Sequence, residues 1–142
     1  MTGSEKIPQP IQDLYAAASA AREHSYSPYS RFSVGAALRT RDGQIFAGCN
    51  VENSTYGATV CAERVAVQSA VAALGKLEIA EIVVVTDTTP PSPPCGICRQ
   101  VIAEFGPSAI VHATNLKGDV VVTPMAELLP HAFSSQHLKS RD

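Results

Sequence analysis

Three cysteines constrain this chain more than any other feature, because they can serve one metal ion only if the fold brings two distant segments together. Residues 61–63 read Cys-Ala-Glu, and residues 94–98 read Pro-Cys-Gly-Ile-Cys. Structural zinc sites use four protein ligands, whereas catalytic sites use three and give the fourth position to water. Cys61, Cys95 and Cys98 therefore predict a zinc centre with one open coordination position.

The first half of the chain alternates between helical and strand-like patterns. Apolar residues at helical spacing predict an opening helix over residues 10–24. Residues 32–40 and 44–49 are β-like, and the Asp-Gly pair between them predicts an antiparallel hairpin. Residues 61–74 have one apolar face and precede a glycine, as expected of a helix that ends there. Residues 78–86 contain a run that is apolar on both faces, which is typical of a buried central strand.

The second half adds a second helix and a second strand pair. A proline-rich loop over residues 89–94 leads into a helix over residues 95–105, which ends at a Gly-Pro pair. Residues 109–113 and 119–123 read as strands, and the connection between them is too short for a parallel crossover. This last pair is therefore predicted to be antiparallel. A proline then precedes a short final helix over residues 125–129.

Length and charge narrow the class of protein. A chain of 142 residues without repeats or linkers predicts a single domain over residues 1–142. The net charge of -2 and the lack of a Lys/Arg cluster argue against a nucleic-acid partner, which needs clustered basic residues. No apolar run approaches the roughly 18 residues of a membrane span, and the first ten residues lack the apolar core of a signal peptide. We therefore expect no membrane association and a cytoplasmic location.

Two further features of the composition bear on function. Four cysteines without a signal peptide indicate metal binding or catalysis more than a disulfide framework. Charged residues make up 17% of the chain, below the usual value of about 25%, which hints at surface that is buried between subunits.

The spacing of the thiols agrees with a shared metal. Cys95 and Cys98, three residues apart on a helix, present their sulfurs on one side of its first turn. Cys61 begins another helix, and the three sulfurs converge if both helices pack on one face of the sheet. Helix N-termini also favour thiolate over thiol. Glu63 then projects toward the metal without being a ligand, where a carboxylate can take a proton from water.

Other interpretations of the cysteines stay open at this point. An isolated Cys-x-x-Cys pair also fits a structural zinc site or a dithiol redox motif, although the redox reading leaves residues 61–63 unexplained. A closed structural site needs a fourth donor, for which Cys49 and His112 are the candidates, yet neither has a spacing that points to the site. We interpret Cys49 as a small buried apolar residue.

The longer pattern resembles the small, tetrameric cytidine deaminases that act on free nucleosides, from about residue 26 to residue 133. The matching runs are Ser-Pro-Tyr-Ser-Arg-Phe-Ser-Val-Gly-Ala-Ala at 27–37, Gly-Cys-Asn-Val-Glu-Asn at 48–53, Tyr-Gly at 56–57, Cys-Ala-Glu-Arg at 61–64, Pro-Cys-Gly-Ile-Cys-Arg-Gln at 94–100 and Glu-Leu-Leu-Pro at 127–130. The zinc motif alone indicates the broad deaminase superfamily. The Asn-x-Glu-Asn run at 50–53 points to a much smaller group of proteins within that superfamily.

This resemblance implies a fold and a reaction. The fold is a three-layer α/β/α arrangement, with a mixed five-stranded sheet whose first hairpin and last strand pair are antiparallel. The reaction is the zinc-dependent hydrolysis of cytidine and 2′-deoxycytidine to uridine and 2′-deoxyuridine, with release of ammonia, in pyrimidine salvage. In the family, zinc-bound hydroxide attacks C4 while Glu63 shuttles protons. The resemblance also implies one catalytic domain per chain and a homotetramer with active sites at subunit interfaces.

The resemblance assigns the substrate contacts as well. Asn50 and Glu52 hydrogen-bond the ribose 3′-hydroxyl, Phe32 stacks on the pyrimidine, and Glu63 with the Ala62 backbone reads the polar edge of the ring. Without the family, Asn50 and Glu52 fit a polar loop almost as well. Without the family, Phe32 fits a core residue better than a stacking platform, because an aromatic residue at the start of a strand is more often part of the core.

Three more residues take roles from the resemblance. Tyr56 helps to shape the pocket, and Phe133 reaches the active site of a neighbouring subunit. Arg64 hydrogen-bonds ligand sulfurs and so withdraws electron density from a centre that three thiolates make electron-rich. Considered alone, Phe133 could instead anchor the C-terminal tail, and Arg64 could be a surface residue paired with a nearby acid.

Two other deaminase classes share the zinc motif. Nucleic-acid editors need a basic surface for a strand, and they resemble this chain less because a helix separates their final strands. Neither feature is found in this sequence. Blasticidin-type antibiotic deaminases are nearer, but Phe32 and the run at 50–53 match the nucleoside enzymes better.

Overall fold

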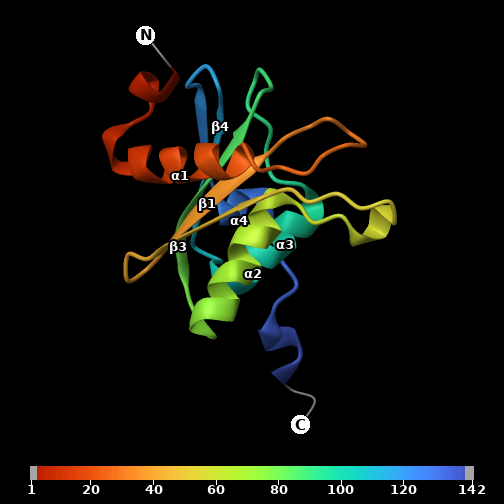
Figure 1. Ribbon diagram of the computed structural model, residues 1–142. Helices are drawn as coiled ribbons and strands as arrows, with labels where there is room; N and C mark the ends of the chain where they lie inside the picture. The colour runs from red at the N-terminus through yellow and green to blue at the C-terminus, as the bar shows by residue number, and fades with distance from the viewer. Residues whose placement is uncertain (1–2, 140–142) are drawn as a thin grey trace.

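The computed structural model describes residues 3–139 and has a single five-stranded sheet at its centre (Figure 1). Its strands are β1 (Gly35–Thr40), β2 (Ile45–Cys49), β3 (Ile79–Thr86), β4 (Ile110–Asn115) and β5 (Val120–Pro124). They lie in the order β2-β1-β3-β4-β5. Only β3 and β4 pair in parallel, and the other neighbours are antiparallel. The predicted mixed sheet, with its antiparallel first and last pairs, is confirmed.

Helices cover both faces of this sheet. Helix α1 (Gln12–Arg22) packs on one face, against β1, β2 and β3. Helices α2 (Ala62–Leu74) and α3 (Gly96–Phe105) lie side by side on the other face, and the short α4 (Met125–Leu128) contacts α3 (Figure 1). The three-layer α/β/α prediction is therefore confirmed. No helix within residues 3–139 has the length and apolar character that a membrane crossing requires.

Two apolar clusters hold the layers together. Under α1, the residues Leu14, Tyr15 and Ala18 pack on side chains of β1 and β3. On the opposite face, α2 and α3 bury the alternate residues of the same two strands. Successive side chains of a strand point to opposite faces, so a strand covered on both sides must be apolar at every position. This requirement explains the unbroken apolar run of β3, which is the central strand as predicted.

The first strand differs from its prediction over residues 32–40. It begins at Gly35, so Phe32 lies in the preceding loop. The side chain of Asn50 takes the place of a strand partner, because its Nδ2 donates to the Phe32 carbonyl (2.7 Å) and its Oδ1 accepts the Val34 N–H (3.0 Å). Such a side-chain bond offers the backbone an alternative to strand pairing.

The remaining boundaries agree with the predictions to within two residues. Helix α1 spans Gln12–Arg22 inside the predicted 10–24, and α2 and α3 each begin one residue after the cysteine expected to start them. Assignments of helix ends commonly vary by this much. Short 3-10 helices were not predicted; they cover Gly3–Lys6, Gln9–Ile11, Tyr56–Ala58 and Ser135–His137. The single domain expected over residues 1–142 extends at both ends beyond the described residues.

Candidate active site

The three predicted ligands meet at one point of the structure. The Sγ atoms of Cys61 and Cys95 are 3.9 Å apart, those of Cys95 and Cys98 are 3.4 Å apart, and all three lie within 4.8 Å of one another. Cys61 is the N-cap of α2 and Cys95 is the N-cap of α3, both with extended backbone and without a side-chain capping bond. Cys98 lies in the first turn of α3 and is fully buried. The sulfurs thus gather where the positive ends of two helix dipoles converge.

This geometry fits a zinc ion. Zinc–sulfur bonds of about 2.3 Å in a tetrahedron place neighbouring sulfurs about 3.8 Å apart, close to the two Sγ distances observed. Thiolates are also the ligands that zinc favours. Within residues 3–139, these three thiols form the only cluster of His, Cys, Asp and Glu side chains with metal-binding geometry. The donor set therefore suits a zinc ion with three protein ligands.

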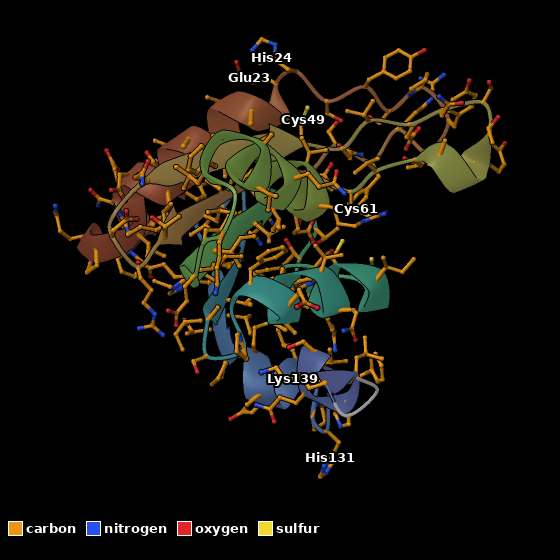
Figure 2. The ribbon with its side chains drawn as sticks, turned by 90° about the horizontal axis from the view of Figure 1, so that it is seen from below. Glu23, His24, Cys49, Cys61, His131 and Lys139 are labelled. Carbon is orange, nitrogen blue, oxygen red and sulfur yellow. The ribbon has the colours of Figure 1, made fainter. Side chains whose placement is uncertain are left out.

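Both candidates for a fourth protein ligand lie on the wrong face of the sheet. Cys49 pairs with Gly35, and a Cβ on Gly35 would collide with Ala18 of α1, so this register position faces α1. His112 pairs with Val83, whose side chain belongs to the cluster under α1, and its Nε2 contacts Glu81 (3.1 Å). The thiols lie under α2 and α3 on the opposite face. Figure 2 shows Cys49 well apart from Cys61.

We expect Cys49→Ser to retain the wild-type zinc content. Its thiol does not belong to the cluster, and partial burial raises its pKa, so it remains a neutral side chain. Zinc per chain, measured by elemental analysis after exhaustive dialysis, should equal that of the wild type. Loss of zinc from this variant would restore the four-cysteine structural site.

The thiols influence one another's protonation. Hydrogen bonds from Cys98 and Arg64 lower the pKa of Cys61 to about 5, so its thiolate forms readily. The hydrogen bond to Cys61, together with burial, raises the pKa of Cys98. Metal binding displaces such protons, because the thiolate is the ligand.

Arg64 is in contact with the cluster. Its Nη2 donates to the Cys61 Sγ (3.6 Å) and to the Thr59 carbonyl (3.3 Å). The contact expected from the resemblance is thus present, and the alternative of a surface residue paired with an acid does not describe this guanidinium. A positive group on a ligand sulfur lowers the electron density that the sulfur donates.

Glu63 is a buried carboxyl beside the thiols. Only 5% of the residue is exposed, and it lines the same cavity as Cys61 and Cys95. Burial raises the pKa of Glu63 to about 7, and the negative charge of Cys61 adds to the effect. A carboxyl with a pKa near 7 accepts and returns a proton readily at neutral pH. Glu63 is therefore suited to act as base and acid in turn.

The raised pKa predicts that zinc-free protein is less stable at pH 8 than at pH 5 through Glu63. The folded state holds this proton up to about pH 7, whereas an unfolded glutamate releases it near pH 4.3, so folding stability falls between these values. The loss is roughly 3 kcal/mol and is complete above the folded pKa. Urea unfolding of the chelator-treated wild type and of Glu63→Gln at both pH values isolates this contribution, because Cys61 titrates in both proteins. An equal pH response in the two proteins would contradict it.

A cavity of about 230 Å³ opens beside Glu63. Its wall includes five residues that the sequence assigned to the substrate and to catalysis, namely Phe32, Asn50, Glu52, Ala62 and Glu63. They come from the loop before β1, the loop after β2 and the start of α2. The fold therefore brings these residues together with the thiols in one place.

Sequence reasoning did not single out several hydroxyl residues of the same wall. Ser30, Thr86 and Ser92 also line the cavity. Ser30 belongs to the run 27–37, and the sequence pattern gives no role to any of the three. Serine and threonine in loops have no periodic signal, so only their neighbours in space mark them.

Asn50 and Glu52 are more than members of a polar loop. Both are less than one tenth exposed and lie in hydrogen-bonded positions. The Oε1 of Glu52 accepts the N–H groups of Tyr29 (2.9 Å) and Ser30 (3.1 Å), and its Oε2 accepts the Ser30 hydroxyl. Asn50 retains a second N–H that can be donated, and the carboxylate of Glu52 retains unused lone pairs.

Tyr56 and Phe133 do not line this cavity. Tyr56 is 76% exposed, and its ring makes an edge contact with Tyr29 at 5.8 Å. Phe133 is 58% exposed and stacks on His137 with ring centroids 5.3 Å apart. The expected roles of Tyr56 and Phe133 therefore stay predictions. If Phe133 meets an active site, the site belongs to another chain.

Comparisons with known proteins agree with the geometry of the site. A family model described as the cytidine and deoxycytidylate deaminase zinc-binding region matches residues 8–114. A cytidine deaminase of Sporosarcina psychrophila is 52% identical over 129 residues, which are 90% of this chain and 94% of that protein. A crystal structure of cytidine deaminase from Burkholderia pseudomallei superposes with a TM-score of 0.81 at 54% identity, covering 85% of this chain and 97% of that one.

A blasticidin-S deaminase of Bacillus cereus, which represents the nearer rival class, is less similar. It is 35% identical over 113 residues, which are 74% of this chain and 79% of that protein.

Proposed function

The chain belongs to the cytidine and deoxycytidylate deaminase family, and on that premise we propose that it hydrolyses cytidine and 2′-deoxycytidine to uridine, 2′-deoxyuridine and ammonia. One observation carries the proposal. Three thiols with zinc-binding geometry and the buried Glu63 border a single cavity. Four residues that the resemblance assigns to the nucleoside, namely Phe32, Asn50, Glu52 and Ala62, line the same cavity.

The residues of the site divide the reaction between them. Zinc, when bound by Cys61, Cys95 and Cys98, supplies a nucleophile at neutral pH by lowering the pKa of water. Glu63 accepts the proton that water gives up and delivers it to ring N3. It then takes the proton of the hydroxyl newly bonded to C4 and passes it to the amino group, which leaves as ammonia. The burial of Glu63 beside Cys61 and Cys95 in the cavity wall places it for both transfers. Arg64, bonded to the Cys61 sulfur, reduces the electron density of the thiolates.

The cavity wall provides for the nucleoside. We assign Phe32 to stack on the pyrimidine and the Ala62 backbone to the polar edge of the ring. Asn50 and Glu52 bind the ribose 3′-hydroxyl. All four residues line the cavity that Glu63 borders, which supports the assignment. The carboxylate and amide are already oriented by the protein, so binding does not have to order them.

Activity assays on the purified protein test the proposal. Loss of ultraviolet absorbance of cytidine and of deoxycytidine, with equimolar release of ammonia, is expected. Blasticidin S serves as the comparison substrate for the rival class. Absence of turnover on both nucleosides would refute the proposal, and turnover of blasticidin S alone would assign the chain to the antibiotic deaminases.

We further propose a homotetramer whose active sites lie at subunit interfaces. Large apolar side chains are exposed on the single chain, among them Val121 and Val122 on the edge strand β5 and Ile97 beside the thiol cluster. Burial of such side chains between subunits would remove apolar surface from water, which favours association. Light scattering should give a mass of about 60 kDa, four times the 15.0 kDa chain. A monomeric mass would contradict both the assembly and the role given to Phe133.

The cellular setting belongs to the same proposal. Conversion of free nucleosides indicates pyrimidine salvage. Thiolate ligands must stay reduced to hold a metal, and the cytoplasm maintains that state. We therefore assign the protein to the cytoplasm.

A further inference from the structure

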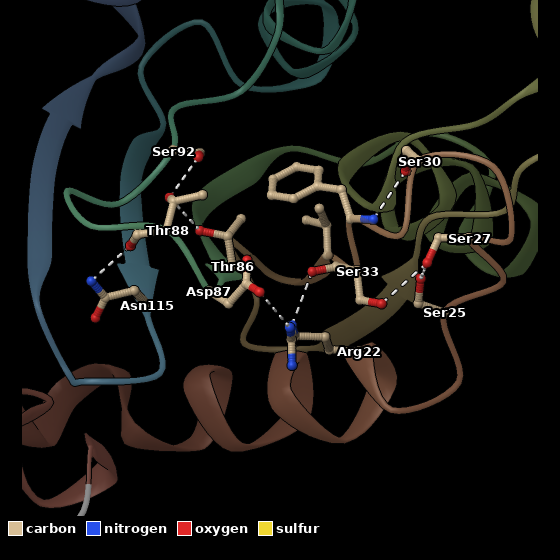
Figure 3. A network of polar contacts seen from close by, with 12 residues as sticks. Arg22, Ser25, Ser27, Ser30, Ser33, Thr86, Asp87, Thr88, Ser92 and Asn115 are labelled. Atoms are coloured by element: carbon tan, nitrogen blue, oxygen red, sulfur yellow. Dashed lines mark hydrogen bonds and ion pairs between the residues drawn. The ribbon is translucent and has the colours of Figure 1, made fainter.

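The loop between α1 and β1 contains four serines, and one of them joins two walls of the cavity. The hydroxyl of Ser30 accepts the N–H of Phe32 (3.0 Å) and donates to Oε2 of Glu52. Ser30 itself lines the cavity. Figure 3 shows its hydroxyl as one end of the polar network of this loop. A single hydroxyl thus connects the residue assigned to the base with a residue assigned to the sugar.

Three donors from one turn surround the carboxylate of Glu52. Besides the Ser30 hydroxyl, the backbone N–H groups of Tyr29 and Ser30 donate to its Oε1. The Ser30 hydroxyl is the largest of the influences that lower the pKa of Glu52, so this carboxylate is charged at neutral pH. Removing the hydroxyl leaves both backbone donors in place. Without the hydroxyl, Oε1 of Glu52 keeps its two backbone donors and Oε2 loses its donor. We therefore expect the Ser30 side chain to determine how the carboxylate is oriented.

The backbone of the turn explains why the hydroxyl reaches both partners. The Arg31 N–H donates to the Ser27 carbonyl (3.0 Å), and Arg31 adopts a left-handed φ of 58°. This left-handed residue lies in the turn whose Phe32 N–H points back to the hydroxyl of Ser30.

We propose that Ser30 is a positioning residue that fixes Glu52 relative to Phe32 and so makes the site select substrates with a ribose 3′-hydroxyl. The inference rests on the proposed function, because it takes the sugar contact of Glu52 from that proposal. Ser30 touches no reacting atom of the substrate. It acts by holding the carboxylate of Glu52 at a set distance from the backbone of Phe32.

The same loop offers a matched control. The hydroxyl of Ser33 contacts that of Ser27 (3.2 Å), away from Glu52. Its carbonyl, which accepts the Arg22 Nε (2.9 Å), is unaffected by a change of side chain. Ser33→Ala therefore removes one hydroxyl from the loop and leaves the connection between Glu52 and Phe32 intact.

Steady-state kinetics on cytidine and 3′-deoxycytidine test the proposal. Ser30→Ala should raise KM for cytidine about tenfold with kcat within about twofold, as expected for a lost hydrogen bond to a charged group that acts in binding. KM for 3′-deoxycytidine should change less than about twofold, because that substrate does not use Glu52. Ser30→Thr, which keeps the hydroxyl, should restore most of the affinity, and Ser33→Ala should match the wild type. Calorimetric titration with uridine and 3′-deoxyuridine should give the same contrast without turnover.

Different outcomes would refute the role of Ser30 and the proposed deaminase function. If Ser30→Ala raised KM equally for cytidine and 3′-deoxycytidine and also lowered the melting temperature, Ser30 would have only a structural role. That result would overturn the proposal. Wild-type kinetics in Ser30→Ala would overturn it as well. A wild-type protein that neither deaminates cytidine nor binds uridine would refute the proposed function itself. The role of Ser30 can therefore be refuted on its own only if the wild-type protein deaminates cytidine.

Discussion

Glu63→Ala is expected to keep one zinc per chain and to deaminate cytidine about 10⁴-fold more slowly than the wild type. General acid–base groups contribute about 10² to 10⁴ in rate, and here one carboxyl serves both the first and the second proton transfer. The upper end of that range is therefore expected. Zinc content stays unchanged because the three thiols that hold the metal do not include this residue.

Zinc content and kcat are measured on Glu63→Ala, with Glu63→Gln as the control. Zinc per chain is determined on the same preparation that is assayed for kcat. Glu63→Gln keeps the volume of the buried side chain and should be almost as inactive, which excludes a cavity as the cause. A Glu63→Ala enzyme within tenfold of the wild-type kcat would remove this residue from the proton transfers.

Cys98→Ser is expected to lose zinc, activity and stability together. Cys98 is fully buried, its sulfur lies 3.4 Å from that of Cys95, and a serine hydroxyl is a poor zinc ligand. Binding that favours the folded state stabilises it by about 4 kcal/mol when the free metal is 1,000 times its Kd. Loss of this contribution of about 4 kcal/mol corresponds to a melting temperature lower by roughly 13 °C.

Cys49→Ser is the matched control for this variant, because it makes the same chemical change on the other face of the sheet. Zinc content, cytidine turnover and thermal melting are measured on both. Treating the wild type with a chelator should reproduce the loss of stability in Cys98→Ser, and added zinc should reverse it only in the wild type. One zinc per chain in Cys98→Ser would show that another donor set holds the metal.

Much of the architecture was predictable because its causes are local in sequence. The run 82–85 is apolar on both faces and forms the centre of the sheet, as β3, between helices on both sides. The Asp-Gly pair predicted the β1–β2 hairpin, where Gly43 takes a φ of +92°. Short connections and capping residues predicted the other elements to within two residues.

The loop around Phe32 was harder to predict. Residues 32–34 have the composition of a strand, yet Asn50, which lies sixteen or more residues away, satisfies their backbone groups. The hydroxyl of Ser30 gives no periodic signal either, and its importance depends on Glu52 twenty-two residues later. The roles expected of Tyr56 and Phe133 stay predictions, because neither residue lines the cavity of the single chain.

The sequence by itself determined the chemistry of this protein: three thiols at two helix starts, a carboxyl beside one of them, and the resemblance that named a nucleoside as substrate. Only the tertiary structure decided that α2 and α3 share a face of the sheet, which brings Cys61 to Cys95 and Cys98 and leaves Cys49 and His112 on the other face. Capping and periodicity act within a few residues, whereas the face on which a helix packs depends on the apolar surface that the whole domain buries.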